Sequence, residues 1–349
     1  MREAARALGY RRSEAARTLR TGRTHSIGFL ARDIANPFYA SMARGVEDAA
    51  RPHGYSVLIG STSNSIEQIK DLLGVFRELR VAGVVASTNP LMPEYTQLVE
   101  DFSMSAPFVQ LGPAASTAHI SRVMVDDERG GYVATGHLLS LGRTRVAIIV
   151  GPLDTYGGTL RLGGYRRALA DWGARFDPMM VIEGSFDFQS GSRAVDQLLE
   201  IAPRPDAIFA ANDLTAIGAI SRLRQRGVRV PDDMAIIGYD DAEVACMYDP
   251  PISTIAQPPF ELGRRGVHML MERLVQASTT QEGDQPDPRR EILDCTLIVR
   301  QSTSGRIEDF QCGPISAQAP WRAYVTALPG PHDTCRESGY VEHAQNSMG

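Results

Sequence analysis

Short apolar runs alternate with amphipathic stretches along most of the chain, a pattern typical of parallel strands connected by helices. Residues 205–241 show it most clearly. The apolar run 207–211 has the length of one buried strand, the apolar positions of 214–226 lie mostly on one helical face, and 234–238 is a second apolar run. We therefore predict a strand–helix–strand unit, whose right-handed crossover places the two strands parallel and adjacent.

Two polar residues, Asn212 and Asp240, come just after these predicted strands, and Asp213 is expected to cap the helix between them. In open α/β sheets the carboxyl ends of the strands form the ligand-binding edge. An amide and a carboxylate side by side at that edge suit a neutral, hydroxyl-rich ligand. In the alternative interpretation, both residues serve only as helix caps and turn residues.

The same alternation continues on both sides of this unit and predicts roughly nine strands in two similar series. After Asp241 the chain returns through a predicted helix at 260–275 and a predicted strand at 291–299. We therefore expect an α/β fold of two doubly wound parallel-sheet lobes, joined by several crossovers, with a cleft between them.

The expected domain organisation follows from these series. The N-terminal lobe is predicted to comprise 25–142 with 256–280, and the C-terminal lobe 143–255 with 288–303. Residues 304–349 lack periodicity and are dominated by Pro, Gly and polar residues, so we predict a disordered tail.

Charge separates the start of the chain from the rest. Residues 1–24 contain seven Arg and two Glu, a net charge of +5, whereas the whole chain has a net charge of −5. Within this basic arm, 13–19 (SEAARTL) can form a short helix capped by Ser13, with Ala16 and Leu19 on one side and Arg17 and Arg20 on the other. A helix this short needs a partner to be stable. The arm is either a helix that contacts DNA or a frayed terminus.

Several function classes find no support in the sequence. The four cysteines are far apart, without CxxC or CxxH spacing, which argues against a zinc site. The loop from Gly151 to Gly158 matches neither of the common phosphate-binding spacings, and no serine, histidine and acid stand in a nucleophile-elbow context. We expect no enzyme, no cofactor and no metal. No apolar run approaches the length of a membrane span and the polar, Arg-rich start is not a secretory signal, so we expect a cytoplasmic protein without a membrane partner.

Aromatic residues supply a further indication of a ligand. Phe38 and Tyr39 stand at the carboxyl end of a predicted strand of the first lobe, and Phe186 stands in a strand-to-helix loop of the second. Rings from two lobes could enclose a sugar or a nucleobase. Arg161 begins a predicted helix of the second lobe, where its guanidinium could bind hydroxyls or a carboxylate. Taken alone, each residue is more readily explained as a surface arginine or a core aromatic, but together with Asn212 and Asp240 they favour a ligand site.

These segments together resemble the LacI/GalR family of bacterial transcriptional regulators. The similarity spans residues 1–303 and is carried, in order, by LGYRRSEAARTLRTGRTHSIGFLARDIANPFYASMARGVEDAA, HLLSLGRTRVAIIVGP, RLGGYRRAL, PDAIFAANDLTAIGA, GVRVPDDMAIIGYDD, TIAQPPFELGRRGV and LIVRQST. The resemblance implies a core like that of periplasmic binding proteins, a homodimer or dimer of dimers, and a hinge helix that inserts into the DNA minor groove.

The resemblance also assigns expected roles to individual residues. The expected effector-binding residues are Phe38, Tyr39, Arg161, Phe186, Asn212, Asp240 and Gln257. The expected DNA-binding residues are Ser13, Ala16, Arg17, Leu19 and Arg20, with Leu19 as the side chain that wedges between base steps. The family's N-terminal helix-turn-helix is represented only by the end of its last helix before Gly9, so this form should bind operator DNA weakly or without sequence preference.

The sequence thus predicts a DNA-binding transcriptional regulator, most simply a repressor, controlled by a sugar in the cleft between two lobes. A purine is the competing effector, and a solute-binding protein of a sugar transporter is the alternative function. For the dimer, we expect apolar positions around Met42–Ala50 and Leu72–Leu79 to form the two-fold interface.

Overall fold

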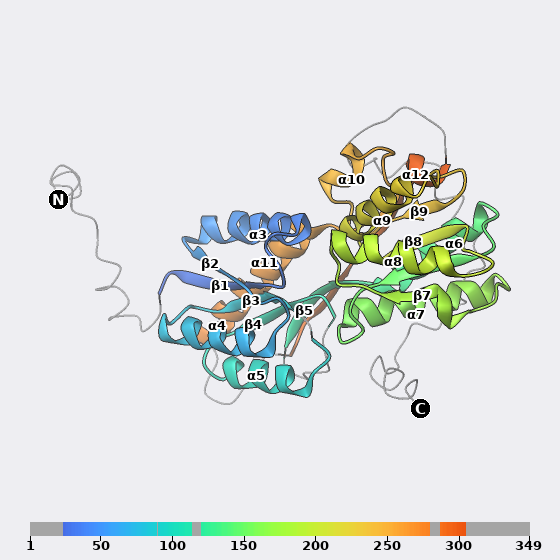
Figure 1. Cartoon of the computed structure of the whole chain (residues 1–349). Helices are drawn as coiled ribbons and strands as arrows, with labels where there is room; N and C mark the ends of the chain where they lie inside the picture. The colour runs from blue at the N-terminus through green and yellow to red at the C-terminus, as the bar shows by residue number, and fades with distance from the viewer. Residues whose placement is uncertain (1–23, 89, 114–119, 280–286, 305–349) are drawn as a thin grey trace, which may run out of the picture. The chain divides into compact units, whose positions relative to one another are not determined.

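The computed structural model describes residues 24–88, 90–113, 120–279 and 287–304. The predicted hinge helix around Leu19 and the predicted disordered tail lie outside these residues. The chain divides into two compact units (Figure 1). Unit 1 comprises Met1–Met124 and Pro259–Ile292, and unit 2 comprises Val125–Pro258 and Leu293–Gly349. None of the helices within the described part of the chain is both long enough and apolar enough to cross a membrane.

Unit 1 is built around a six-stranded sheet with the strand order β11-β5-β4-β3-β1-β2. Strand β1 pairs in parallel with both β2 and β3, and the pairs β3–β4 and β4–β5 are parallel as well. The elements are β1 (Ser26–Ala31), α3 (Pro37–Ala50), η1 (Arg51–His53), β2 (Ser56–Ser61), α4 (Ile66–Glu78), β3 (Val84–Ser87), α5 (Pro93–Ser103), β4 (Phe108–Leu111), β5 (Ser121–Val125), α11 (Pro259–Thr279) and β11 (Arg290–Leu293).

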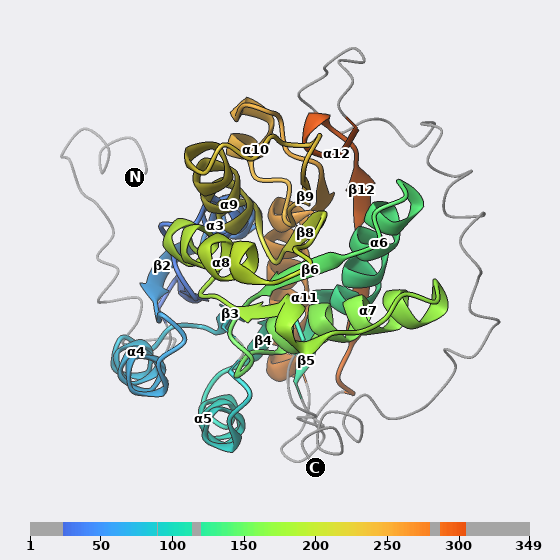
Figure 2. The same ribbon diagram turned by 45° about the vertical axis from the view of Figure 1, so that its right-hand side comes forward.

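Helices cover both faces of the unit 1 sheet. Helices α4 and α5 bury apolar residues such as Phe76 and Phe102 against the strands in one core. Helices α3 and α11 lie together on the other face (Figures 1 and 2). They approach closely because glycines face the partner backbone: a Cβ on Gly45 would lie 2.0 Å from the carbonyl oxygen of Phe260.

Unit 2 contains a four-stranded parallel sheet in the order β7-β6-β8-β9 and a small antiparallel sheet of β10 and β12. Helices α6 and α7 pack on one face of the parallel sheet, and α8 and α9 pack on the other. The elements are α6 (Asp127–Ser140), β6 (Val146–Val150), α7 (Tyr156–Asp171), η2 (Pro178–Met180), β7 (Val181–Glu183), α8 (Phe188–Glu200), β8 (Ala207–Ala210), α9 (Asp213–Gln225), β9 (Ala235–Ile237), α10 (Glu243–Met247), β10 (Thr254–Ala256), β12 (Thr296–Ile298) and α12 (Gln301–Ser304).

The predicted fold class is confirmed. Five strands of the unit 1 sheet and all four strands of the larger unit 2 sheet pair in parallel, and helices cover both faces of each sheet. The expected β8–α9–β9 unit is present with adjacent parallel strands. The described residues contain twelve strands, more than expected. The single strand predicted at 291–299 is two strands, because β11 joins the sheet of unit 1 and β12 pairs with β10 in unit 2. Helix α5 and strand β5 were not predicted.

The boundary between the units differs from the expected one. The structure places the first crossing at Met124–Val125, before α6, whereas the sequence predicted it after residue 142. Helix α6 belongs to unit 2 because it packs tightly on α7: a Cβ on Gly164 would lie 2.0 Å from the carbonyl oxygen of Glu128. Its Leu138 completes the core beneath β6 and β8. The other crossings follow Pro258 and Ile292.

The expected dimer surface is partly contradicted. Met42 and Val46 of α3 are buried inside unit 1, and α3 packs on α11. They are therefore core residues of the chain itself. On α4, in contrast, Val75 and Leu79 are 45% and 48% exposed, so the α4 half of the predicted interface stays a prediction.

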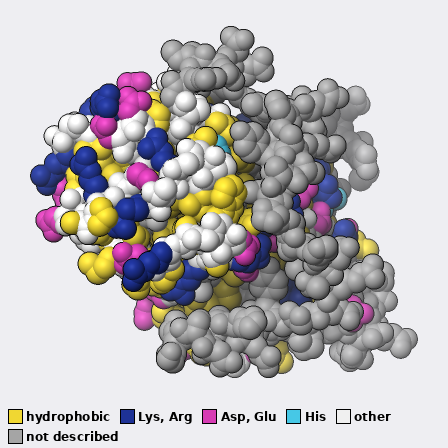
Figure 3. All heavy atoms as spheres, turned by 90° about the vertical axis from the view of Figure 1, so that its right-hand side faces the viewer, with side chains coloured by type: hydrophobic (Ala, Val, Ile, Leu, Met, Phe, Trp, Pro, Cys, Tyr) yellow, Lys and Arg dark blue, Asp and Glu magenta, His cyan; other side chains and the backbone are white. Residues whose placement is uncertain are grey.

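The described surface carries both signs of charge. Figure 3 shows Arg side chains interspersed with Asp and Glu on one face of the molecule. Many of these charges form ion pairs, such as that of Arg222 with Asp196 at 2.8 Å. Such partly exposed pairs at the surface contribute little to stability.

Candidate functional site

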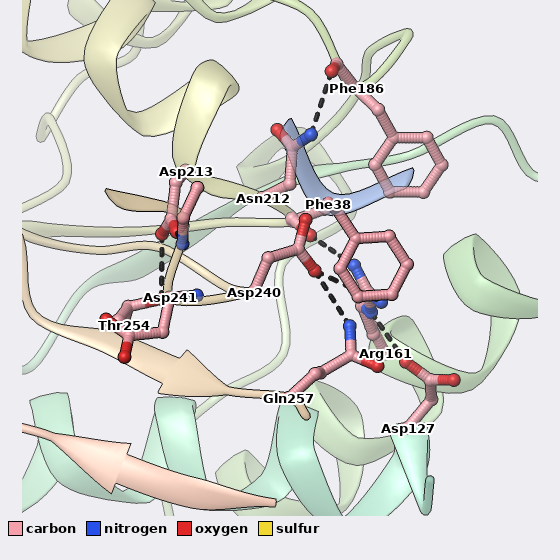
Figure 4. A network of polar contacts seen from close by, with 12 residues as sticks. Phe38, Asp127, Arg161, Phe186, Asn212, Asp213, Asp240, Asp241, Thr254 and Gln257 are labelled. Carbon is pink, nitrogen blue, oxygen red and sulfur yellow. Dashed lines mark hydrogen bonds and ion pairs between the residues drawn. The ribbon is translucent and has the colours of Figure 1, made fainter. Parts of the chain in front are cut away.

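Polar side chains of unit 2 gather where its parallel strands end. Strands β8 and β9 end at Ala210 and Ile237, and Asn212 and Asp240 follow them. Arg161 reaches the same place from α7, which follows β6. Figure 4 shows these residues in one network with Asp127 and Gln257. All of them are at most 8% exposed, so their charges interact in a medium much less polarisable than water.

Arg161 is the centre of the network. Its Nε donates to Asp127 Oδ1 at 2.8 Å, its Nη1 donates to the carbonyl oxygen of Ala211 at 2.5 Å, and its Nη2 lies 3.9 Å from Asp240 Oδ1. Burial alone would lower the pKa of Arg161, but the neighbouring carboxylates, Asp127 first among them, outweigh it and hold the pKa above its ordinary value. The guanidinium therefore carries its charge at every physiological pH.

Two aromatic rings lie against this guanidinium. The Cζ atom of Arg161 is 3.7 Å from the ring centroid of Tyr239 and 5.7 Å from that of Phe186. Both distances allow a cation–π attraction, which is stronger where water is excluded. The rings thus restrict the plane of the guanidinium.

Asp240 is held in an uncommon backbone conformation. Its φ is +105° and that of Asp241 is +58°, values that non-glycine residues rarely adopt. The backbone N–H of Asp240 donates to Ile255 O at 2.8 Å, and Gln257 Nε2 donates to its Oδ1 at 2.7 Å. Burial raises the pKa of Asp240 to about 7, although the charge of Arg161 and the Gln257 hydrogen bond act in the opposite direction.

Asp213 stabilises the turn at Asp240 and Asp241 through two hydrogen bonds of its carboxylate. Its Oδ2 accepts from the backbone N–H of Ala242 and its Oδ1 accepts from the Thr254 hydroxyl, both at 2.7 Å. Burial, followed by the charge of Asp240, raises the pKa of Asp213 well above its ordinary value. The expectation that Asp213 caps α9 is wrong: the N-cap is Asn212, and the Asp213 side chain points toward the turn that follows β9.

Asn212 uses both ends of its amide within the protein. Oδ1 accepts from the backbone N–H of Thr215 at 2.9 Å and caps α9, while Nδ2 donates to the carbonyl oxygen of Phe186 at 2.8 Å. The side chain was expected to lie open to a ligand. Its observed contacts agree instead with the alternative interpretation, in which Asn212 serves as a helix cap. In addition, the side chain connects α9 to the loop that carries Phe186.

Five of the seven expected effector-binding residues belong to unit 2 and come together there: Arg161, Phe186, Asn212, Asp240 and Gln257. Phe38 and Tyr39 belong to unit 1, in the first turn of α3, with their rings in edge-to-face contact at 5.2 Å. The five expected DNA-binding residues lie outside the described part of the chain. Three residues around Arg161 and Asp240 were not expected there: Asp127 pairs with Arg161, Tyr239 lies against its guanidinium, and Arg300 pairs with Asp241.

Asp127 is the second of two consecutive aspartates at the start of α6, and no site role was predicted for it. In the structure Asp126 caps α6 through the N–H of Arg129, and Asp127 ion-pairs with Arg161. The sequence did contain a signal for this role: one aspartate is enough to cap the helix, so the second one was available for another contact. For Arg300 the sequence offered no such signal, because the residue lies 59 positions from Asp241, the residue that it contacts.

The charges of the network limit what it can bind. With both carboxylates ionised, Asp127, Arg161 and Asp240 together carry one net negative charge, which disfavours an anionic ligand. A guanidinium has five N–H donors, and Asp127 and Ala211 occupy two of them. The remaining donors, together with the acceptors of Asp240, match a neutral molecule with several hydroxyls. Across the described residues, no group of three or more His, Cys, Asp or Glu could hold a metal ion.

Comparisons with known proteins cover most of the chain. A model of the periplasmic binding protein-like domain matches residues 135–303. The chain is 36% identical to the HTH-type transcriptional repressor PurR of Aliivibrio fischeri over 274 residues. This alignment covers 78% of this chain and 81% of the relative.

Solved structures give a similar picture. A complex of the transcriptional regulator CelR with cellobiose matches with a TM-score of 0.73 and 32% identity, covering 86% of this chain and 89% of the other. A LacI family transcriptional regulator from Enterococcus faecium with bound ribose matches with a TM-score of 0.68 and 29% identity, covering 80% and 98%. These proteins are transcription regulators. They therefore favour transcription regulation over the alternative function, that of a transporter's solute-binding protein.

Proposed function

Because the chain belongs to the LacI/GalR family of transcriptional regulators, and is a DNA-binding repressor controlled by a small-molecule effector, we propose that this effector is a carbohydrate bound by the network around Arg161. The observation that carries the proposal is the pairing of Arg161 with Asp127 and Asp240 beside the rings of Phe186 and Tyr239. Solved relatives with cellobiose or ribose bound support the same ligand class.

The proposed contacts follow from the donors and acceptors that remain. Free N–H groups of Arg161 donate to ring hydroxyl oxygens, and the carboxylate of Asp240 accepts from adjacent hydroxyls. Phe186 offers its face to the apolar side of a sugar ring. Gln257 keeps the Asp240 carboxylate in place through its hydrogen bond. Phe38 and Tyr39 of unit 1 are proposed to supply further aromatic contacts.

A purine is the competing effector, since aromatic faces also suit nucleobases. The carbohydrate is favoured because a guanidinium flanked by carboxylates matches the adjacent hydroxyls of a sugar, each of which both donates and accepts.

The rest of the proposal concerns partners. Ser13, Ala16, Arg17, Leu19 and Arg20 are proposed to contact operator DNA, with Leu19 as the minor-groove wedge. We propose a cytoplasmic homodimer, or a dimer of dimers, because the two half-sites of an operator require two copies. No catalytic role, cofactor or metal belongs to this proposal.

Thermal unfolding of the purified chain tests the ligand class. We expect a rise in Tm with a carbohydrate from a panel that includes cellobiose and ribose, and none with adenine. Asp240→Ala should remove the rise while the ligand-free protein stays folded. Asp249→Ala is the matched control, because its side chain is 89% exposed. A shift with adenine alone, or an undiminished carbohydrate shift in Asp240→Ala, would contradict the proposal.

A further inference from the structure

We propose that Asn212 is a positioning residue, which holds the ring of Phe186 in place for the effector through the hydrogen bond from Nδ2 to the Phe186 carbonyl. This role differs from the direct ligand contact expected from the sequence. It rests on the proposed function in so far as the effector contacts Phe186.

The backbone at Phe186 needs external support. Its φ is +62°, a left-handed conformation that a bulky residue adopts only where its surroundings hold it. The next residue, Asp187, is already committed to the start of α8, because its Oδ1 accepts from the backbone N–H of Ser190 at 2.7 Å. The Phe186 carbonyl is a point at which another element holds this residue, because it accepts from Nδ2 of Asn212 at 2.8 Å.

The ring lies on a surface that only glycine leaves open. A Cβ added to Gly151, directly after β6, would lie 1.9 Å from Cζ of Phe186. From there the ring lies beside the guanidinium of Arg161, 5.7 Å from centroid to Cζ. A small rotation of the Phe186 backbone would move the ring away from both Gly151 and Arg161.

The Asn212 side chain has the functional groups needed to hold the backbone of Phe186. The residue follows β8, whereas Phe186 follows β7, and they are 26 positions apart. Its carbonyl oxygen caps α9, so the rigid start of a helix anchors its amide nitrogen. The side chain is only 2% exposed, and both ends have partners at hydrogen-bond distance. A serine at this position could still cap α9 but has no amide to reach Phe186.

Affinities of four proteins separate a positioning role from a direct contact: the parent, Asn212→Ser, Phe186→Ala and the double variant, titrated calorimetrically with cellobiose. We expect Asn212→Ser to weaken binding about tenfold in the parent and less than about twofold in the Phe186→Ala background, because residues that act through one another are not additive. Equal losses in both backgrounds would mean that the amide contacts the sugar directly, and would overturn the proposal.

A measurement without ligand keeps the inference separate from the proposed function. In hydrogen exchange of the ligand-free chain, Asn212→Ser should speed exchange in the segment 184–187 and leave the Thr215 amide protected, because serine still caps α9. Ser65→Ala, which removes the N-cap of α4 in unit 1, controls for a general loss of stability. Unchanged exchange at 184–187 would overturn the positioning role even if cellobiose does not bind. Failure of every carbohydrate to bind would overturn the proposed function alone.

Discussion

Nη2 of Arg300 lies 2.7 Å from Oδ1 of Asp241, although the two residues are 59 positions apart. The Arg300 side chain is 7% exposed, and its Nη1 donates to Ile252 O at 2.9 Å. Just beyond it, the buried Ser302 hydroxyl donates to Ile236 O at 2.6 Å. The last described segment of the chain thus supports the turn that presents Asp240.

Loss of this ion pair should weaken both folding and effector binding. Arg300→Ala leaves Asp241 without its cation in a strained turn, and we expect a decrease of about 3 kcal/mol in the free energy of unfolding. Urea denaturation measures it, and calorimetry should show weaker carbohydrate binding. The control is Arg229→Ala, whose side chain is 70% exposed and pairs with Asp232 and Asp233; there we expect less than about 1 kcal/mol. Similar losses in both variants would contradict a special role for Arg300.

Effector affinity should depend on pH through Asp240. Its pKa of about 7 means that the carboxylate is mostly protonated at pH 6 and mostly ionised at pH 8. If sugar hydroxyls donate to the ionised form, binding is strongest above pH 7 and should weaken about tenfold from pH 8 to pH 6. Calorimetry at several pH values measures this change. Asp240→Asn should bind less tightly and show a flat profile, and a parent profile as flat as that of the variant would exclude the mechanism.

Acid should destabilise the folded chain through His137. Burial lowers the pKa of His137 to about 4, and its Nε2 lies 3.0 Å from the Thr303 hydroxyl. Between about pH 6.5 and pH 4 the unfolded chain binds a proton that the folded chain does not, so this contribution to stability is full above pH 6.5 and decreases as the pH falls. We expect His137→Gln to reduce the dependence of Tm on pH in this range, by an amount equivalent to roughly 3 kcal/mol at most.

A second variant distinguishes titration from packing at this position. Thr303→Val removes the hydrogen-bond partner but keeps the imidazole, so it should lower Tm at every pH and retain the slope. If His137→Gln retains the parent's slope, another group is responsible for the acid sensitivity.

The packing of α6 on α7 can be tested with one methyl group. Gly164→Ala places a Cβ 2.0 Å from Glu128 O, and because the obstacle is backbone, we expect a loss of about 1–3 kcal/mol. Gly74→Ala is the matched control: it lies within α4, and a Cβ there meets nothing within 4 Å. That change should stabilise by about 0.5–1 kcal/mol. Chemical denaturation of both variants measures the difference, and a neutral Gly164→Ala would contradict the close helix contact.

The periodicity of the sequence was sufficient to predict the α/β class and the β8–α9–β9 unit. Strand periodicity and helical amphipathicity reflect burial of nearby residues, so they can be read along the chain. The wrong assignments of α6 and of the α3 dimer surface arose because periodicity shows that a residue is buried but not which partner buries it. Helix α6 is only weakly amphipathic, and nothing in its sequence pattern distinguishes packing on α7 from packing on the sheet of unit 1. Likewise, Met42 and Val46 are apolar whether they contact α11 of the same chain or a second copy.

For the site, the sequence by itself determined which chemical groups follow the strands: the carboxylate of Asp240, the amide of Asn212 and the ring of Phe186 are consequences of topology and register. The tertiary structure decided what those groups do. Asn212 faces Phe186 and Thr215, Asp127 pairs with Arg161, and Arg300 supports Asp241, because each contact depends on the direction of side chains from elements far apart in the chain. A one-dimensional pattern carries residue spacing, whereas hydrogen bonds require angles and distances that only the packed chain defines.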